Sequence, residues 1–180
     1  MTAMRLFVAI PFSEAALDAA EVRSSYVKSV SRRGNFTARE NLHLTLAFLG
    51  EVDDAAAIVH ALNGLRWTAF PIRIGGLGSF PSRNATTVFA VCDGGAPLSV
   101  LAEAVRTALR TAGIAFDGKP FSPHLTLVRE SDLPAAAIAL GAFPPAVFLV
   151  DRFVLFESLR PDGRLVYRPL ATFPADGVPR

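Results

Sequence analysis

The sequence predicts an α+β fold of antiparallel strands and helices, built as two similar lobes that face each other. Helical and strand stretches mix without the strict alternation typical of a parallel sheet, and the turn sequence at residues 161–163 joins the last two strands in a hairpin. The letters HLTL occur at residues 43–46 and again at 124–127, each copy between a long helical stretch and a shorter one. The copies lie 81 residues apart in a chain of 180, so a repeated lobe explains them.

Residues 1–180 are expected to form one two-lobed domain, because the length is that of about one domain and no linker rich in Pro, Gly or Ser divides it. Hydrophobic residues make up 51% and charged residues 19%, which excludes a disordered chain. No run reaches the ~20 apolar residues of a membrane span, and the apolar start indicates a buried strand rather than a signal peptide. A single cysteine, Cys92, cannot form an internal disulfide, which fits the reducing cytoplasm.

The expected strands are rich in β-branched and aromatic residues. They cover residues 5–12, 43–50, 70–80, 86–92, 123–129, 146–158 and 164–173. We expect Gly50 to end the second strand, and the glycines of the third to loosen it. Residues 146–158 are expected to form one long strand, which pairs with the last one.

Four stretches predict helices by the spacing of their apolar residues and by their end residues. They cover residues 14–30, 53–65, 97–113 and 133–140. Ser13 is a candidate N-cap for the first helix, and Asp53 or Asp54 for the second, while Gly113 is placed to end the third. The tail from residue 174 is expected to fray.

The charge balance argues against a strongly basic, general nucleic-acid binder, since 18 Lys and Arg face 16 Asp and Glu, a net charge of +2. Basic residues still gather before the first HLTL and near the end of the chain. These residues are Lys28, Arg32, Arg33 and Arg39, then Arg160, Arg164 and Arg168. The simpler interpretation is a solvated surface, and the functional one is a rim that attracts phosphate groups.

Alternation along a strand gives the HLTL repeat its meaning. In each copy the two leucines share one face and call for a core, so the histidine and threonine point away from it. If the two strands are related by the repeat, His43, Thr45, His124 and Thr126 converge on one groove.

Two histidines and two threonines suit phosphodiester cleavage. Near neutral pH one imidazole can accept a proton while the other donates one, and each such transfer contributes about 10²–10⁴-fold to a rate. Threonine hydroxyls can donate hydrogen bonds to phosphoryl oxygens. A zinc site is disfavoured, because neither motif supplies a third ligand. His60 lies in an expected helix and Cys92 in an apolar strand, so both are interpreted as structural.

These residues resemble a known family. Paired H-x-T-x motifs half a chain apart are similar to those of the 2H phosphoesterase superfamily, and more closely to the bacterial and archaeal RNA 2′,3′-cyclic phosphodiesterases, also called 2′-5′ RNA ligases. The likeness extends to "MRLFVAIPF" at the start, to "ENLHLTLAFLGEV" and "KPFSPHLTLVR" around the motifs, and to the closing "FVLFESLRPDGRLVYRPLATFP". It departs at Phe89, in a strand where many relatives carry a Trp. The only Trp here, Trp67, lies elsewhere.

The resemblance implies two pseudo-symmetric lobes of antiparallel sheet, with helices outside, around a central cleft. It implies an RNA-processing hydrolase that opens an RNA-terminal 2′,3′-cyclic phosphate to a 2′-phosphate, with reversible 2′-5′ ligation. His43 is then the proton donor, His124 the proton acceptor, and Thr45 and Thr126 bind the phosphate. Arg129 matches an arginine that often follows the second motif, although simple alternation places it on the other face.

The implied partner is RNA with a 2′,3′-cyclic phosphate end, such as a tRNA fragment. No cofactor, metal or membrane is expected, and we expect a monomer. Two alternatives stay open, namely a cyclic phosphodiesterase that acts on a small nucleotide and a non-catalytic module that binds RNA ends.

Overall fold

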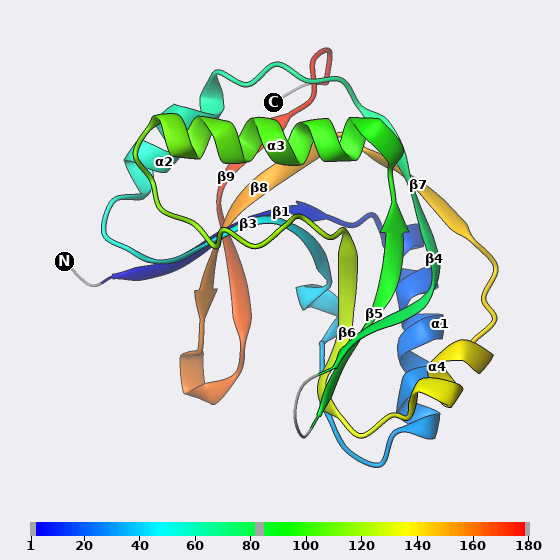
Figure 1. Cartoon of the computed structure of the whole chain (residues 1–180). Coiled ribbons are helices and arrows are strands. Elements are labelled where there is room, and N and C mark those ends of the chain that lie inside the picture. The colour runs from blue at the N-terminus through cyan, green and yellow to red at the C-terminus, as the bar shows by residue number, and fades with distance from the viewer. Residues whose placement is uncertain (1–2, 82–84, 179–180) are drawn as a thin grey trace.

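A computed structural model describes residues 3–81 and 85–178 (Figure 1), and in this part of the chain the strands form a single sheet. The strands are β1 (Met4–Pro11), β2 (Asn35–Phe36), β3 (His43–Val52), β4 (Phe70–Pro81), β5 (Thr86–Asp93), β6 (His124–Ser131), β7 (Ala146–Val150), β8 (Arg152–Leu159) and β9 (Val166–Pro174). The helices are α1 (Glu14–Val30), α2 (Ala55–Asn63), α3 (Gly95–Thr111) and α4 (Ala135–Leu140), with short 3₁₀ turns at Arg39–Asn41 and Pro161–Gly163. No helix of the described ranges has the length and apolar character needed to cross a membrane.

The sheet is antiparallel in every strand pair and is ordered symmetrically about its centre. The order is β7-β4-β5-β6-β3-β1-β8-β9, with the short β2 added on β6. The two HLTL strands, β6 and β3, are therefore neighbours, and β5 and β1 flank them. The predicted α+β fold with antiparallel pairing is confirmed, and the strand order carries the expected pseudo-symmetry.

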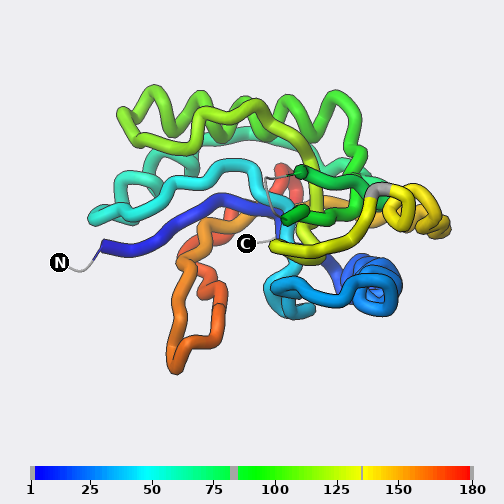
Figure 2. The backbone as a smooth tube through the Cα atoms, turned by 60° about the horizontal axis from the view of Figure 1, so that its bottom comes forward, coloured from blue at the N-terminus to red at the C-terminus, as the bar shows by residue number. Residues whose placement is uncertain are grey.

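The long helices cover the outside of the curved sheet. Both α1 and α3 have 17 residues, and each is followed, after its HLTL strand, by a shorter helix. In the first half α1 packs against β6, β4 and β7, whereas in the second half α3 packs against β3 and β4. Each half thus supplies the helix that covers the other half's motif strand. The β8–β9 hairpin extends away from both helices (Figures 1 and 2).

The predicted helix ends are largely confirmed. Ser13 Oγ accepts from the amide of Ala16 at 3.4 Å, and Asp54, rather than Asp53, caps α2 by accepting from Ala56 at 2.8 Å. Gly113 follows the C-cap of α3 with φ at +70°, a left-handed conformation that glycine adopts at low cost.

The structure corrects three expectations. Gly50 does not end β3, because it takes φ of +74° beside a register shift between Leu6 and Phe7, and the strand continues to Val52. Residues 146–158 form two strands that part at Asp151, since β7 pairs with β4 and β8 with β1. The tail is held as far as it is described, because the amide of Asp176 donates to the Trp67 carbonyl at 2.8 Å. Residues 179–180 lie outside the described ranges.

One apolar core joins the two halves. The four motif leucines, Leu44, Leu46, Leu125 and Leu127, are all 0% exposed within it. Arg23 is buried beside this core, and its guanidinium donates to carbonyls of Ala19, Ile74, Gly75 and Pro144. The arginine therefore ties α1 to β4 and to the segment before β7.

The leucines behind the motifs are expected to dominate local stability. Replacing Leu125 by Ala should lower the free energy of unfolding by about 2–5 kcal/mol, because it removes buried methyl groups and leaves a cavity. Urea denaturation checks this, with Leu149→Ala as the control, since Leu149 is 62% exposed on β7. Equal losses in the two variants would contradict the placement of Leu125.

Candidate active site

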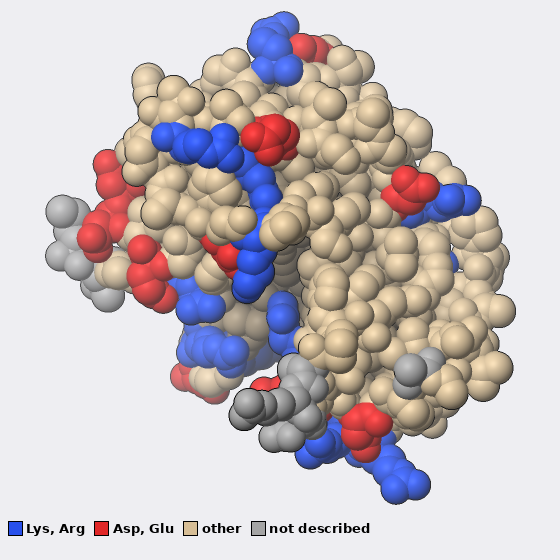
Figure 3. Space-filling view, in the orientation of Figure 1, with Lys and Arg blue, Asp and Glu red and all other residues tan. Residues whose placement is uncertain are grey.

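The two motifs meet at the centre of the sheet. Leu44 of β3 pairs with Leu125 of β6 in antiparallel register. The adjoining residues are then neighbours across the strands, His43 beside Thr126 and Thr45 beside His124. His43, Thr45 and His124 line a cleft of about 910 Å³, and Figure 3 shows a hollow with Lys and Arg side chains along it at the centre of this face.

Both imidazoles are held by the same backbone contact. Nδ1 of His43 lies 2.8 Å from the carbonyl oxygen of Asn41, and Nδ1 of His124 lies 2.6 Å from that of Ser122. A carbonyl only accepts, so each Nδ1 carries the hydrogen and donates it. Each Nε2 is thereby left for chemistry, and that of His43 lies 3.1 Å from Thr45 Oγ1. When His43 is neutral, the threonine hydroxyl donates to it.

Aromatic rings wall each histidine. Phe7 and Tyr167 lie 4.9 and 5.1 Å from the His43 ring, and Phe80 and Phe89 lie 5.0 and 5.2 Å from the His124 ring, between ring centroids. This burial, together with the positive charges of Arg129 and His124, lowers the pKa of His43 to about 4, although the hydrogen bond to the Asn41 carbonyl acts in the opposite direction. Burial, followed by Arg129, also lowers the pKa of His124. Without a ligand the cleft therefore favours two neutral imidazoles.

A β-bulge at the last residue of each motif interrupts simple alternation. In β3, Val8 pairs with Ala47 but Ala9 pairs with Thr45, so Leu46 is an extra residue. Leu46 and Ala47 are then both buried. Phe48 therefore lines the cleft beside Ala47, whereas regular alternation would have turned it away.

The same shift occurs in β6. Val88 pairs with Val128 but Phe89 pairs with Thr126, which leaves Leu127 as the extra residue. Arg129 accordingly lines the cleft, where its charge acts on both histidines. The alternation argument that placed Arg129 on the other face was wrong, because it took the strand as regular.

Comparison with known proteins agrees with this geometry. A sequence model of the 2′-5′ RNA ligase superfamily matches residues 11–162. The chain belongs to this superfamily. Its relatives include the RNA 2′,3′-cyclic phosphodiesterase of Thermotoga maritima, which is 33% identical over 89% of this chain and 90% of that protein. The protein of the same name from Geobacillus stearothermophilus is 30% identical over 96% of this chain, but the match spans only 58% of its own length.

Solved structures show the same fold. Escherichia coli LigT in complex with 3′-AMP superimposes with a TM-score of 0.78 at 26% sequence identity, covering 97% of this chain and 99% of that one. The family indicated by the paired HLTL motifs is thus confirmed. The expected class of enzyme is confirmed at the same level, because the curated relatives are RNA 2′,3′-cyclic phosphodiesterases.

Positive charge dominates the cleft of this superfamily member. Five cationic side chains line it, those of Arg5, Arg106, Lys119, Arg129 and Arg160. Asp117 is the carboxylate among the lining residues, and it is paired with Lys119 at 3.1 Å. Such a surplus of cations favours an anionic ligand. In the described ranges no group of three or more His, Cys, Asp or Glu is placed to hold a metal ion.

Most residues of the two predicted basic clusters lie outside the cleft. Arg39 pairs with Glu14, Asp18 and Glu21. Arg164 pairs with Glu40, and Arg168 with Glu157, so these three arginines are engaged within the protein. From the second cluster Arg160 lines the cleft. His60 is exposed on α2, and Cys92 is buried in the core as predicted.

The aromatic residue that lines the cleft beside His124 is not the one at the position where many relatives carry a Trp. Phe89, the residue in place of the family's Trp, is only 8% exposed and lies 4.4 Å, between ring centroids, from Phe80. Phe80 is 41% exposed and lines the cleft, whereas Phe89 lies behind it. Trp67 packs against Phe70 and Phe153.

Sequence reasoning missed the role of Asn41. Its backbone carbonyl holds His43, and its buried side chain donates to the Leu165 carbonyl at 2.9 Å. This hydrogen bond fixes the start of β3 to the segment that leads into β9, and Tyr167 belongs to β9. The Asn two residues before the histidine is the available signal, but an identical role for Ser122 shows that the contact depends on backbone and not on residue type.

The low pKa of His43 gives a testable titration. Its ring should titrate near pH 4 in the free protein and at a higher pH with inorganic phosphate, since a bound anion favours the imidazolium. Because the folded pKa lies below the unfolded value of about 6.5, this group's contribution to stability is complete above pH 6.5 and is lost as pH falls toward 4. NMR of the histidine ring protons measures the midpoint. A midpoint of 6.5 in the free protein would contradict the burial argument.

Proposed function

We propose that this chain hydrolyses the 2′,3′-cyclic phosphate at the end of an RNA strand to a 2′-phosphate, with no metal ion, by acid–base catalysis between His43 and His124. One observation carries the proposal, namely that adjacent antiparallel strands present the two imidazoles to the same cationic cleft, each held through Nδ1. The names of the relatives and the 3′-AMP complex of LigT support a nucleotide phosphate as the ligand.

In the proposed reaction His124 takes a proton from water, and the water oxygen attacks phosphorus. The bond from phosphorus to the 3′ oxygen breaks, and protonated His43 gives its proton to that oxygen. The products are a 3′-hydroxyl and a 2′-phosphate. Thr45, Thr126 and Arg129 hold the phosphoryl oxygens as charge develops on them.

The acid role requires that His43 gain a proton when substrate binds. Its pKa is low because of burial and of nearby positive charge. An anionic phosphate offsets that positive charge, so substrate and proton binding favour each other. Once Nε2 is protonated, Thr45 is free to turn its hydroxyl toward phosphate, because the imidazolium no longer accepts from it.

Ligation follows from the same site when an alcohol replaces water as the nucleophile, since the same bond from phosphorus to the 3′ oxygen breaks and His43 again protonates that oxygen. If a 5′-hydroxyl replaces water, His124 takes its proton and the product is a 2′-5′ linkage. Assays with a cyclic-phosphate-ended oligonucleotide, beside a nucleoside 2′,3′-cyclic phosphate, separate the RNA enzyme from an enzyme of small nucleotides. Binding without turnover of either substrate would indicate a non-catalytic module.

Both histidines should be essential. His43→Ala and His124→Ala are each expected to lower kcat by about 10²–10⁴-fold, because each removes one positioned proton transfer. His60→Ala is the matched control, since this third histidine is exposed on α2. EDTA should leave the wild-type rate unchanged. Full activity in either cleft variant would refute the mechanism, and a rate abolished by EDTA would indicate a metal site.

Arg129 is expected to bind the substrate phosphate and to lower the pKa of both histidine rings. One substitution tests both effects, and the pKa change would not follow from a purely structural role. Arg129→Gln is expected to raise KM roughly tenfold, the loss of one charged hydrogen bond, and to raise the pKa of both histidine rings, because the guanidinium lowers both. Kinetics and ring NMR measure these effects. Arg73→Gln is the control, since Arg73 is exposed and paired with Asp93. Unchanged ring titrations would show that Arg129 does not face the histidines.

A further inference from the structure

A second hollow adjoins the catalytic cleft. It has a volume of about 550 Å³ and shares Arg5, Ser158 and Arg160 with the cleft. Its remaining lining comes from Ala3, Glu51, Glu157 and Leu159. Because three residues belong to both hollows, a chain-like ligand in the cleft can continue into this extension.

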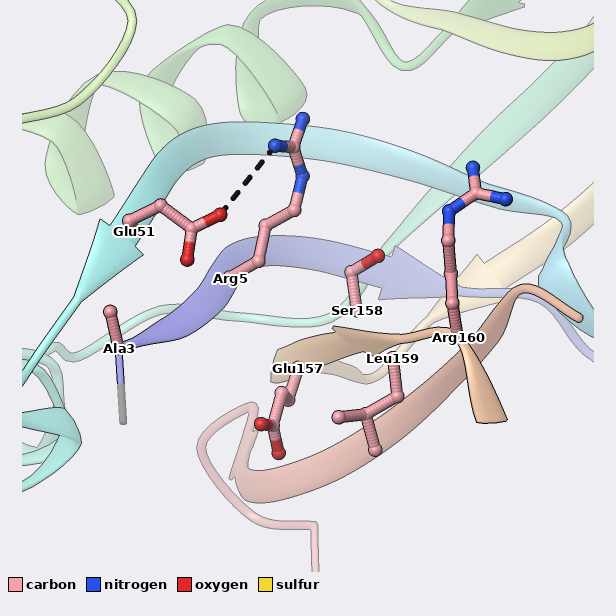
Figure 4. A pocket seen from close by; sticks show the side chains of 7 residues that line it. All are labelled: Ala3, Arg5, Glu51, Glu157, Ser158, Leu159 and Arg160. Carbon is pink, nitrogen blue, oxygen red and sulfur yellow. Dashed lines mark ion pairs between the residues drawn. The ribbon is translucent and has the colours of Figure 1, made fainter. Parts of the chain in front are cut away.

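Strand alternation places the side chains of the extension on two opposite sides. In Figure 4, Arg5 of β1, Ser158 of β8 and Arg160, which directly follows β8, project to the same side, whereas Glu157 and Leu159 project to the other. Glu157 is 5% exposed and is neutralised by Arg168. The side shared with the cleft therefore presents two guanidinium groups with a hydroxyl between them.

Arg160 stands apart from its neighbours on the hairpin. Arg164 and Arg168 are paired with Glu40 and Glu157. Within residues 3–81 and 85–178 the Arg160 guanidinium makes no hydrogen bond or ion pair, although the backbone carbonyl of Arg160 accepts from the amide of Gly163 at 3.2 Å. The Arg5 guanidinium lies over the Phe48 ring, 4.9 Å from its centroid, and its ion pair with Glu51 is loose, at 3.7 Å between two side chains that are each more than half exposed. Such exposed pairs contribute little energy, so both guanidinium groups can turn to a phosphate.

The extension lies on the side of His43. Arg5 is in β1, which pairs with β3, while Ser158 is in β8, which pairs with β1, and Arg160 directly follows β8. In the proposed reaction His43 faces the 3′ oxygen of the ribose, so the ribose and the strand that precedes it leave the cleft on this side. Water or a 5′-hydroxyl enters on the side of His124.

We propose that Arg160, with Arg5 and Ser158, binds the phosphate that precedes the terminal nucleotide, which makes an RNA strand of two or more nucleotides the preferred substrate class. This inference rests on the proposed phosphodiesterase function. A mononucleotide has no phosphate to reach the extension, so it forgoes this contact.

The test compares a nucleoside 2′,3′-cyclic phosphate with a dinucleotide that ends in the same cyclic nucleotide. Wild type should have the higher kcat/KM for the dinucleotide, and Arg160→Gln should reduce the dinucleotide-to-mononucleotide ratio by roughly 3- to 10-fold, mainly through KM. The slope of log(kcat/KM) against log[salt] for the dinucleotide should become shallower by about 0.7, the value for one released phosphate contact on a single strand.

Arg164→Gln is the matched control, because it makes the same change four residues along the hairpin at an arginine that lines neither hollow. It should leave the ratio as in wild type. Ser158→Ala tests the hydroxyl separately and should lower the ratio less than Arg160→Gln. Turnover of both substrates with an unaltered ratio in Arg160→Gln overturns this inference alone. Failure of wild type to turn over either substrate overturns the proposed function.

Discussion

The register between β3 and β6 is the constraint on which the site depends. The pair Leu44–Leu125 places two His-x-Thr faces side by side and two Leu-x-Leu faces in one core. A slip by one residue in either strand would turn its leucines into the cleft and its histidine into the core. Burial of four leucines therefore fixes the positions of the two imidazoles, and the stability of the core and the geometry of the cleft come from the same strand pairing.

Sequence patterns predicted the parts of this arrangement that repeat and missed those that depend on long-range pairing. The HLTL letters were enough to foresee that His43, Thr45 and His124 line one cleft, because alternation along a strand is a local property, whereas Thr126 is not among the lining residues. The return of Phe48 and Arg129 to the cleft depends on bulges that show only in the pairing with β1 and β5. The break at Asp151 was missed for a related reason. Residues 146–158 look uniformly strand-like, but their two halves pair with opposite wings of the sheet.

The cleft combines two features that each weaken protonation of the histidines. Aromatic rings exclude water from them, and arginines add positive charge nearby. The arginines favour an anion, and a bound phosphate balances their charge and offers hydrogen bonds to rings that have lost their hydration. The free protein thus favours the neutral form of the His43 and His124 rings. The carbonyls of Asn41 and Ser122 keep these rings oriented.

Each long helix packs on the motif strand of the other half, which makes the folding of the two halves interdependent. Although the halves resemble each other, neither covers its own motif strand, because α1 lies on β6 and α3 on β3. A fragment that contained one repeat would expose its leucines and lack one of the two cleft histidines. In the whole chain the two halves close one core and bring both histidines to one cleft.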